Sequence, residues 1–127
     1  MQKSYLFIAH TEKMGRGVFT KKEIAANTVI EVAPVIVMTN DDRKLVDQTL
    51  LHDYIFEWGE ESERCCMALG LVPIYNHSYN SNCEYYMDFE SDSILIKTVR
   101  DIEKGEELTI NYNGDYNDSK KVWFEAF

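Results

Sequence analysis

The chain has 127 residues, of which 45% are hydrophobic and 13% aromatic, a composition that fits one compact globular domain and excludes a disordered chain. Its formal net charge of −9 disfavours nonspecific binding to nucleic acid, whose phosphates attract clustered Lys and Arg, and favours a basic partner or simple solubility. No apolar run reaches the roughly 18 residues of a membrane-spanning helix, and the first ten residues lack a small-residue cleavage site. We therefore expect a soluble intracellular protein, either cytoplasmic or nuclear, that does not enter a membrane.

The first forty residues favour β-structure. Residues 4–11 predict a first strand, and residues 15–39 predict a glycine turn, a strand, a polar loop and a longer strand rich in Val and Ile. Apolar residues come closest to helical spacing over residues 41–59, where Asp41 or Asp42 could cap a helix and Gly59 would end it. The partial apolar face of this helix would consist of Leu45, Leu50, Leu51, Tyr54 and Ile55.

The second half of the chain continues the β pattern. An apolar run at residues 67–74 predicts a core strand, and residues 83–89 and 93–99 predict two strands joined as a hairpin by a short acidic loop. The last ten residues, 118–127, could form a short helix with aromatic anchors. The whole pattern predicts a mostly β domain with one or two short helices.

The chain has three cysteines, Cys65, Cys66 and Cys83. Their number is odd and their spacing is not that of a disulfide framework, which indicates a reducing compartment. We expect three free thiols.

Polar residues crowd together in the stretch "YNHSYNSNCEYY" at residues 75–86. A structural zinc site would need about four Cys or His ligands in paired spacings, whereas His77 and Cys83 stand alone, so we expect no metal. A Cys-His-Asn hydrolase could be assembled from Cys65 or Cys66 with His77 and Asn76, but no nucleophile signature surrounds them. The stretch could also be a tight turn in which His77 is a buried, hydrogen-bonded group.

Two further segments complete a larger pattern. "KMGRGVF" at residues 13–19, "NHSYNSNC" at residues 76–83 and "GEELTINY" at residues 105–112 occur in this order. Together they resemble the SET-domain lysine methyltransferases, over about residues 4–116, and especially the minimal SET proteins of large viruses and some bacteria. The resemblance implies one SET domain over residues 1–127: small, mostly antiparallel sheets, a C-terminal pseudoknot, and an aromatic tail at 117–127 that closes the site.

The resemblance also implies a cofactor, S-adenosylmethionine. The family's cofactor-binding positions correspond here to Met14, Gly15, Arg16, Gly17, Asn76 and His77. The glycines would let the backbone come close to the cofactor, Asn76 would bind its methionine part through the side chain, and His77 would hold the adenine mainly through the backbone. Asn82 would brace the crossing of the two distant segments. Pro73 replaces an arginine that many family members carry, so a contact to the cofactor carboxylate must come from elsewhere, and Lys13 or Arg16 could supply it.

The catalytic residue implied by the resemblance is Tyr112. Methyl transfer is an in-line displacement that needs a neutral amine held close to the methyl group, and a phenol with a pKa near 10 is better suited to orient that amine than to act as its base. Tyr54 and Tyr116 are the predicted walls of a lysine channel, although both could instead serve packing. Ile110 stands where the family often has Phe or Tyr and predicts di- or trimethylated products.

The substrate prediction rests on charge. Four acidic residues expected near the channel suit a basic peptide such as a histone tail, bound as an added strand beside residues 67–71; they are Asp53, Glu57, Glu60 and Glu61. A noncatalytic peptide-binding module is the alternative function. A homodimer is also possible, because the run at residues 29–38 offers apolar surface.

Overall fold

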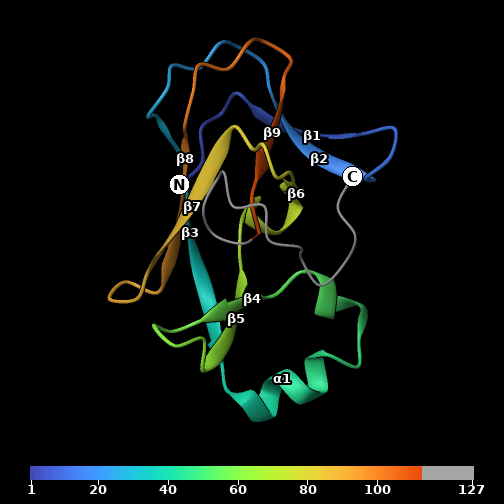
Figure 1. Ribbon diagram of the computed structural model, residues 1–127, viewed down its shortest axis with the longest axis vertical. Coiled ribbons are helices and arrows are strands. Elements are labelled where there is room, and N and C mark those ends of the chain that lie inside the picture. The colour runs from blue at the N-terminus through green and yellow to red at the C-terminus, as the bar shows by residue number, and fades with distance from the viewer. Residues whose placement is uncertain (113–127) are drawn as a thin grey trace.

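The computed structural model of the protein describes residues 1–112 and contains two β-sheets (Figure 1). The first has the strand order β1 (Leu6–His10), β2 (Arg16–Thr20), β9 (Glu107–Ile110) and β6 (Asn76–His77). The second has the order β4 (Phe56–Trp58), β5 (Arg64–Ala68), β3 (Val29–Met38), β8 (Ser93–Thr98) and β7 (Cys83–Asp88). All neighbours are antiparallel except β6 and β9, which run parallel. The mostly β, antiparallel prediction is confirmed.

Two hairpins form from predicted strands, and the second of them, β7–β8, is predicted as a hairpin. β1 pairs with β2 in a register that sets Ala9 opposite Gly17 and His10 opposite Arg16. β7 pairs with β8 over their whole length, and alternate β8 residues, Ile94 and Ile96, are fully buried. This alternation, with one face packed on the core, is what gives the hairpin its register.

The predicted helix over residues 41–59 is wrong in its length and its cap. Helix α1 spans Asn40–Val46, and a single 3-10 turn, η1, spans Leu50–Asp53. Thr39 caps α1, and Asp42 reciprocates from the third helical position in a capping box. The apolar face is not buried, since Leu45 is 68% and Leu50 74% exposed. Without packing on that face a longer helix gains no stability, so the chain leaves the helix before Gly59 and enters β4.

The apolar run at residues 67–74 is not one strand. β5 ends at Ala68, the chain turns at Gly70 with φ +68°, and a second 3-10 turn, η2, spans Val72–Ile74. A positive φ is incompatible with a continuing strand, and Pro73 has no N–H to donate to a strand neighbour. This turn directly precedes β6 and brings the polar stretch to the end of the first sheet.

β3 is an interior strand, with β5 on one side and β8 on the other. Much of its apolar surface is therefore used inside the protein: Ile30 and Ala33 belong to the core, while Ile36 is exposed. A homodimer through this run stays a prediction.

Three further expectations concern the cysteines, membrane-spanning helices and the C-terminal residues. All three cysteines are buried and free, as predicted. No helix within residues 1–112 is long and apolar enough to cross a membrane. The predicted C-terminal helix, with Trp123, Phe124 and Phe127, lies outside the described residues.

Candidate functional site

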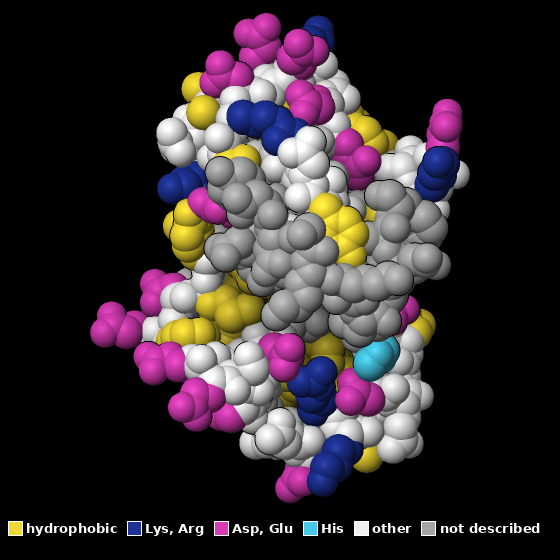
Figure 2. Space-filling view, viewed as in Figure 1, with side chains coloured by type: hydrophobic (Ala, Val, Ile, Leu, Met, Phe, Trp, Pro, Cys, Tyr) yellow, Lys and Arg dark blue, Asp and Glu magenta, His cyan; other side chains and the backbone are white. Residues whose placement is uncertain are grey.

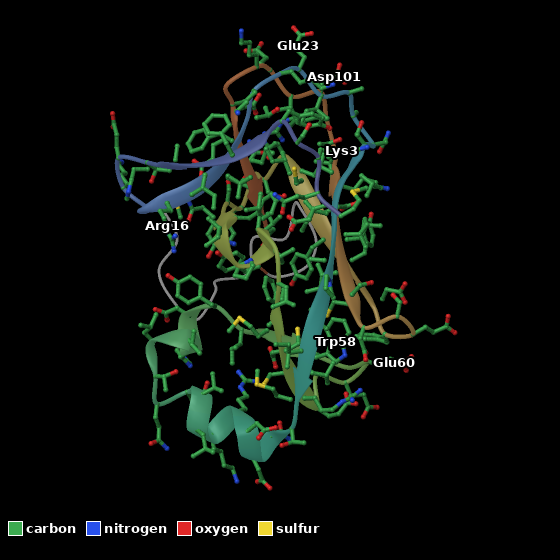
Figure 3. The ribbon with its side chains drawn as sticks, turned by 180° about the vertical axis from the view of Figure 1, so that it is seen from behind. Lys3, Arg16, Glu23, Trp58, Glu60 and Asp101 are labelled. Atoms are coloured by element: carbon green, nitrogen blue, oxygen red, sulfur yellow. The ribbon has the colours of Figure 1, made fainter. Side chains whose placement is uncertain are left out.

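A cleft of about 560 Å³ lies where the β1–β2 turn, the two 3-10 turns, β6 and the end of β9 meet. Its lining combines apolar, aromatic and polar side chains: His10, Met14, Gly15, Arg16, Asp53, Tyr54, Pro73, Ile74, Asn76 and Tyr112. Its volume and mixed lining are those of a small-molecule site. The three motifs found in the sequence therefore converge on one cavity. Figure 3 shows Arg16 at the start of β2, facing the region of η1.

Tyr112 is held at three points. Its backbone N–H donates to Nδ1 of His77 at 2.9 Å, and its hydroxyl donates to the backbone carbonyl oxygen of Tyr75 at 2.8 Å. Its own carbonyl oxygen accepts a hydrogen bond from the hydroxyl of Tyr85 at 3.2 Å. Burial, and secondarily the neighbouring Tyr54, raises the pKa of Tyr112 to about 12. The phenol is therefore neutral at physiological pH and serves as a fixed, polar group in the cleft wall.

His77 connects β6 to β9 and is buried. Nδ1 can accept the Tyr112 N–H only when it carries no proton. Burial lowers the pKa of the imidazole, which favours this neutral form. The ring lies edge-on to Tyr79, with centroids 4.5 Å apart. The expected buried, hydrogen-bonded ring is thus observed, and its role beside a cofactor stays a prediction.

Asn76 joins the glycine motif, residues 13–19, to the first residue of β9. Its Nδ2 donates to the carbonyl oxygen of Arg16 at 3.0 Å and to Oε2 of Glu107 at 2.8 Å. A Cβ on Gly17 would stand 2.4 Å from that carboxylate oxygen and 2.9 Å from Nδ2 of Asn76. Only glycine lets β2 approach this closely.

Asn82 joins the polar stretch to the last motif. Its Nδ2 donates to the carbonyl oxygen of Glu107 at 2.8 Å and to Oε2 of Glu106 at 2.9 Å. Its Oδ1 accepts the N–H of Thr109 at 2.8 Å. These bonds link the segments for which a crossing is expected, and the pseudoknot itself stays a prediction.

The three expected channel residues lie in different places. Tyr54 lines the cleft. Ile110 is fully buried in the hydrophobic core and is not part of the cleft lining, so the structure gives no support to a product preference based on it. Tyr116 lies outside the described residues.

The acidic residues do not gather at the cleft as expected. Asp53 lines it, whereas Glu57 lies 3.8 Å from Arg43. Glu60 and Glu61 line a separate hollow at the β4–β5 turn. Figure 3 shows Glu60 on the side of the molecule opposite Arg16. The expectation is wrong for these three glutamates, because β4 carries the chain away from η1.

Sequence reasoning missed some cleft residues. His10 reaches the cleft because the hairpin register sets it opposite Arg16, and Ile74 because the chain turns at Gly70. Tyr85, which holds Tyr112, has only strand alternation as a sequence signal.

The alternative chemistries gain no geometric support. Within residues 1–112, no three His, Cys, Asp or Glu side chains form a group that could hold a metal ion. Burial raises the pKa of the thiol of Cys66 to about 12 and also raises that of Cys65. Both thiols therefore stay protonated, which makes them poor nucleophiles.

Comparison with known proteins decides the family. A family model of the SET domain matches residues 15–113. The chain belongs to the SET-domain family. Its similarity to a histone-lysine N-methyltransferase from Schizosaccharomyces pombe, described as specific for H3 lysine 37, is 36% identity over 97% of this chain and 79% of the yeast protein.

Other SET proteins are similar over most of this chain. A histone-lysine N-methyltransferase of Cryptococcus neoformans, described as H3 lysine-36 specific, is 34% identical over 83% of this chain. Histone-lysine N-methyltransferase 2D of Homo sapiens is 30% identical over 93% of it. The chain spans only 14% and 2% of these two relatives. The crystal structure of a Plasmodium falciparum protein described as a histone methyltransferase superposes with a TM-score of 0.66 at 25% identity, covering 91% of this chain and 99% of that one.

Proposed function

We propose that this SET domain transfers methyl groups from S-adenosylmethionine to lysine side chains of a basic protein, with a histone tail as substrate. The observation that carries the proposal is the position of Tyr112, whose hydroxyl is anchored at a cleft built from all three motifs. The family and the names of the three relatives support lysine methylation.

The cleft suits the proposed cofactor. Its volume of about 560 Å³ lies within the range of small-molecule sites. The glycine turn leaves room at the backbone, since a Cβ on Gly15 would meet nothing within 4 Å. Met14, Arg16 and Asn76 would hold the cofactor from the β1–β2 and β6 sides. When bound, S-adenosylmethionine supplies an electrophilic methyl group on a cationic sulfonium.

The residues of the chain would orient the lysine. An unperturbed lysine has a pKa of about 10.4, so the amine must lose its proton before it can attack, and a desolvated cleft favours the neutral form. The Tyr112 oxygen would accept a hydrogen bond from the amine and fix its direction. Tyr54 would hold the lysine by cation–π attraction of about 0.5–2 kcal/mol while it is still charged.

The charge of the surface and an open strand edge support a basic peptide as the substrate. Acidic side chains are spread over the face shown in Figure 2, and Asp53 places one of them at the cleft. β4 pairs only with Arg64–Cys66 of β5. Within residues 1–112, the β4 side of Met67 and Ala68 at the end of β5 therefore has no strand neighbour, and an extended peptide could pair there. The turn at Gly70 stops such pairing along the rest of residues 67–71.

Mass spectrometry tests the function. The protein is incubated with S-adenosylmethionine and a panel of basic proteins that includes core histones, and peptides are searched for 14 Da steps on lysine. Tyr112→Phe and Asn76→Ala should lose the steps. Tyr86→Phe, which alters an exposed tyrosine of β7, should keep them. Cofactor and peptide binding without any step would instead support the noncatalytic peptide-binding module.

A further inference from the structure

Glu31 carries a buried carboxyl group in the sheet interior. It lies in the interior strand β3 and is 1% exposed. Among residues 1–112, no other Asp or Glu side chain is buried. A buried carboxylate is costly unless hydrogen bonds compensate it, so its partners indicate what the group does.

Both carboxylate oxygens bind the turn between β5 and β6. Oε2 accepts the backbone N–H of Leu71 at 2.7 Å, and Oε1 accepts the hydroxyl of Tyr75 at 3.1 Å. Leu71 is the N-cap of the 3-10 turn η2, and Tyr75 follows its last residue. Burial raises the pKa of Glu31, and these two hydrogen bonds oppose the shift. One side chain therefore fixes the beginning and the end of the turn.

The chain is shaped to receive this carboxylate. Gly70 has φ +68°, and a Cβ at that position would stand 2.3 Å from Oε2 of Glu31. A larger residue would thus combine backbone strain with a clash against the carboxylate. Just before the glycine, Leu69 donates its N–H to the carbonyl oxygen of Pro34 at 3.0 Å, which anchors the turn to β3.

The residue at the end of this turn, Tyr75, contacts Tyr112. The backbone carbonyl oxygen of Tyr75, whose hydroxyl Glu31 holds, accepts the Tyr112 hydroxyl at 2.8 Å. The next residue, Asn76, binds the carbonyl oxygen of Arg16 in the glycine motif. A shift of the turn would move the acceptor of Tyr112 most, because Glu31 holds Tyr75 itself, whereas Asn76 keeps its own partners in Arg16 and Glu107.

We propose that Glu31 is a positioning residue for methyl transfer, which fixes the turn at residues 70–75 so that the Tyr75 carbonyl orients the Tyr112 hydroxyl. The proposal rests on the proposed function. Glu31 does not line the cleft and acts through Tyr75.

Three variants separate positioning from general stability. Glu31→Gln replaces one acceptor oxygen with an NH2 donor, and Tyr75→Phe removes one hydrogen bond but keeps the backbone carbonyl. Thr98→Val is the matched control, because Thr98 is fully buried in β8 and its hydroxyl bonds Ala25 and Thr28, away from the cleft. kcat and KM are measured well below the Tm of each variant.

We expect the kcat of Glu31→Gln to fall about tenfold or more and that of Tyr75→Phe by about threefold or more, while KM for S-adenosylmethionine changes less. Thr98→Val should keep its kcat within about twofold at a comparable loss in Tm. Unchanged kcat in both Glu31→Gln and Tyr75→Phe, or an equal loss in Thr98→Val, would overturn the proposal. If Glu31→Gln does not fold, Tyr75→Phe decides alone.

A second measurement does not need turnover. The protein is labelled with 13C at Cζ of tyrosine, and the Tyr112 signal is assigned by its loss in Tyr112→Phe. This signal should shift in Glu31→Gln and Tyr75→Phe and stay unchanged in Thr98→Val; an unmoved signal in the first two would refute positioning. If the wild type methylates no protein, the proposed function fails, and the tyrosine signal still decides the role of Glu31.

Discussion

The hydroxyl of Tyr112 donates a hydrogen bond to the backbone carbonyl oxygen of Tyr75 at 2.8 Å, across 37 positions of the chain. A phenol has one proton to donate, so this bond leaves only the oxygen lone pairs for a second partner. Such an oxygen suits an amine or ammonium, which donates, and does not suit another acceptor. The pKa of about 12 agrees with this role, because the hydroxyl keeps its proton at neutral pH.

Tyr112→Phe should therefore remove the acceptor and lower kcat by about 100-fold or more, in the range seen when one oriented polar group is lost from an active site. Binding of S-adenosylmethionine, measured by calorimetry, should persist. Tyr85→Phe is the control, since it removes only the hydrogen bond to the Tyr112 carbonyl and should cost far less activity. Equal losses in the two variants would mean that the Tyr112 hydroxyl has no direct role.

Two glycines with open space around them, Gly15 and Gly105, give a matched test of the proposed cofactor site. Gly15 has φ +72° and Gly105 has φ +85°, and a Cβ at either would meet nothing within 4 Å. Alanine at either should cost about 1–2 kcal/mol of stability, because a non-glycine residue is strained at positive φ. Only Gly15→Ala should also weaken S-adenosylmethionine binding, since only Gly15 lines the cleft. Equal affinities in the two variants, measured by calorimetry, would place the cofactor elsewhere.

The sequence motifs predict several residues that line the cleft, because each motif is a short local pattern: Met14, Gly15, Arg16, Asn76 and Tyr112. Gly17 and His77 belong to the same motifs but do not line it, and the roles of all seven toward a cofactor or a lysine stay predictions. The residues around them could not be found this way. His10 and Tyr85 depend on strand register and on the packing of segments far apart in the chain.

Two differences between the sequence predictions and the structure have physical causes that the sequence shows only in part: the helix over residues 41–59 and the buried acid Glu31. The helix over residues 41–59 was predicted from apolar spacing, but Leu45 and Leu50 remain exposed, and spacing alone does not supply a surface to pack against. Glu31 is not among the residues that the motifs predict for the site, because it is a single acid within an apolar strand. An acid within "VIEVAPVIV" interrupts a pattern expected for a buried strand, and that interruption was the available signal.

Asn82 should be important for stability rather than for chemistry. Its amide donates to Glu106 and Glu107 and accepts from Thr109, and it is buried. Asn82→Ala should lower the free energy of unfolding by about 2–4 kcal/mol, because it leaves buried partners unsatisfied. Urea denaturation measures this change. Asn80→Ala, at an exposed position, should cost less than about 0.5 kcal/mol, and a similar cost in both variants would contradict the bracing role.

His77 should make the fold sensitive to mild acid. Burial lowers its pKa below the usual 6.5, so the folded state binds the proton less readily than the unfolded state. For a base of this kind the free energy of unfolding falls as the pH drops below about 6.5, and the loss continues down to the pKa of the folded state. Glu31, whose pKa is raised from 4.5, acts in the opposite sense: its contribution is lost as the pH rises through its folded pKa.

The slope of Tm between pH 7.5 and 5.5 isolates the histidine, because Glu31 is present in every protein compared. His77→Gln keeps an oxygen that can accept the Tyr112 N–H but does not titrate, so its Tm should fall less on acidification than that of the wild type. Parallel slopes for the wild type and His77→Gln would show that the buried imidazole does not govern acid stability, since the histidine is the titrating group that distinguishes them.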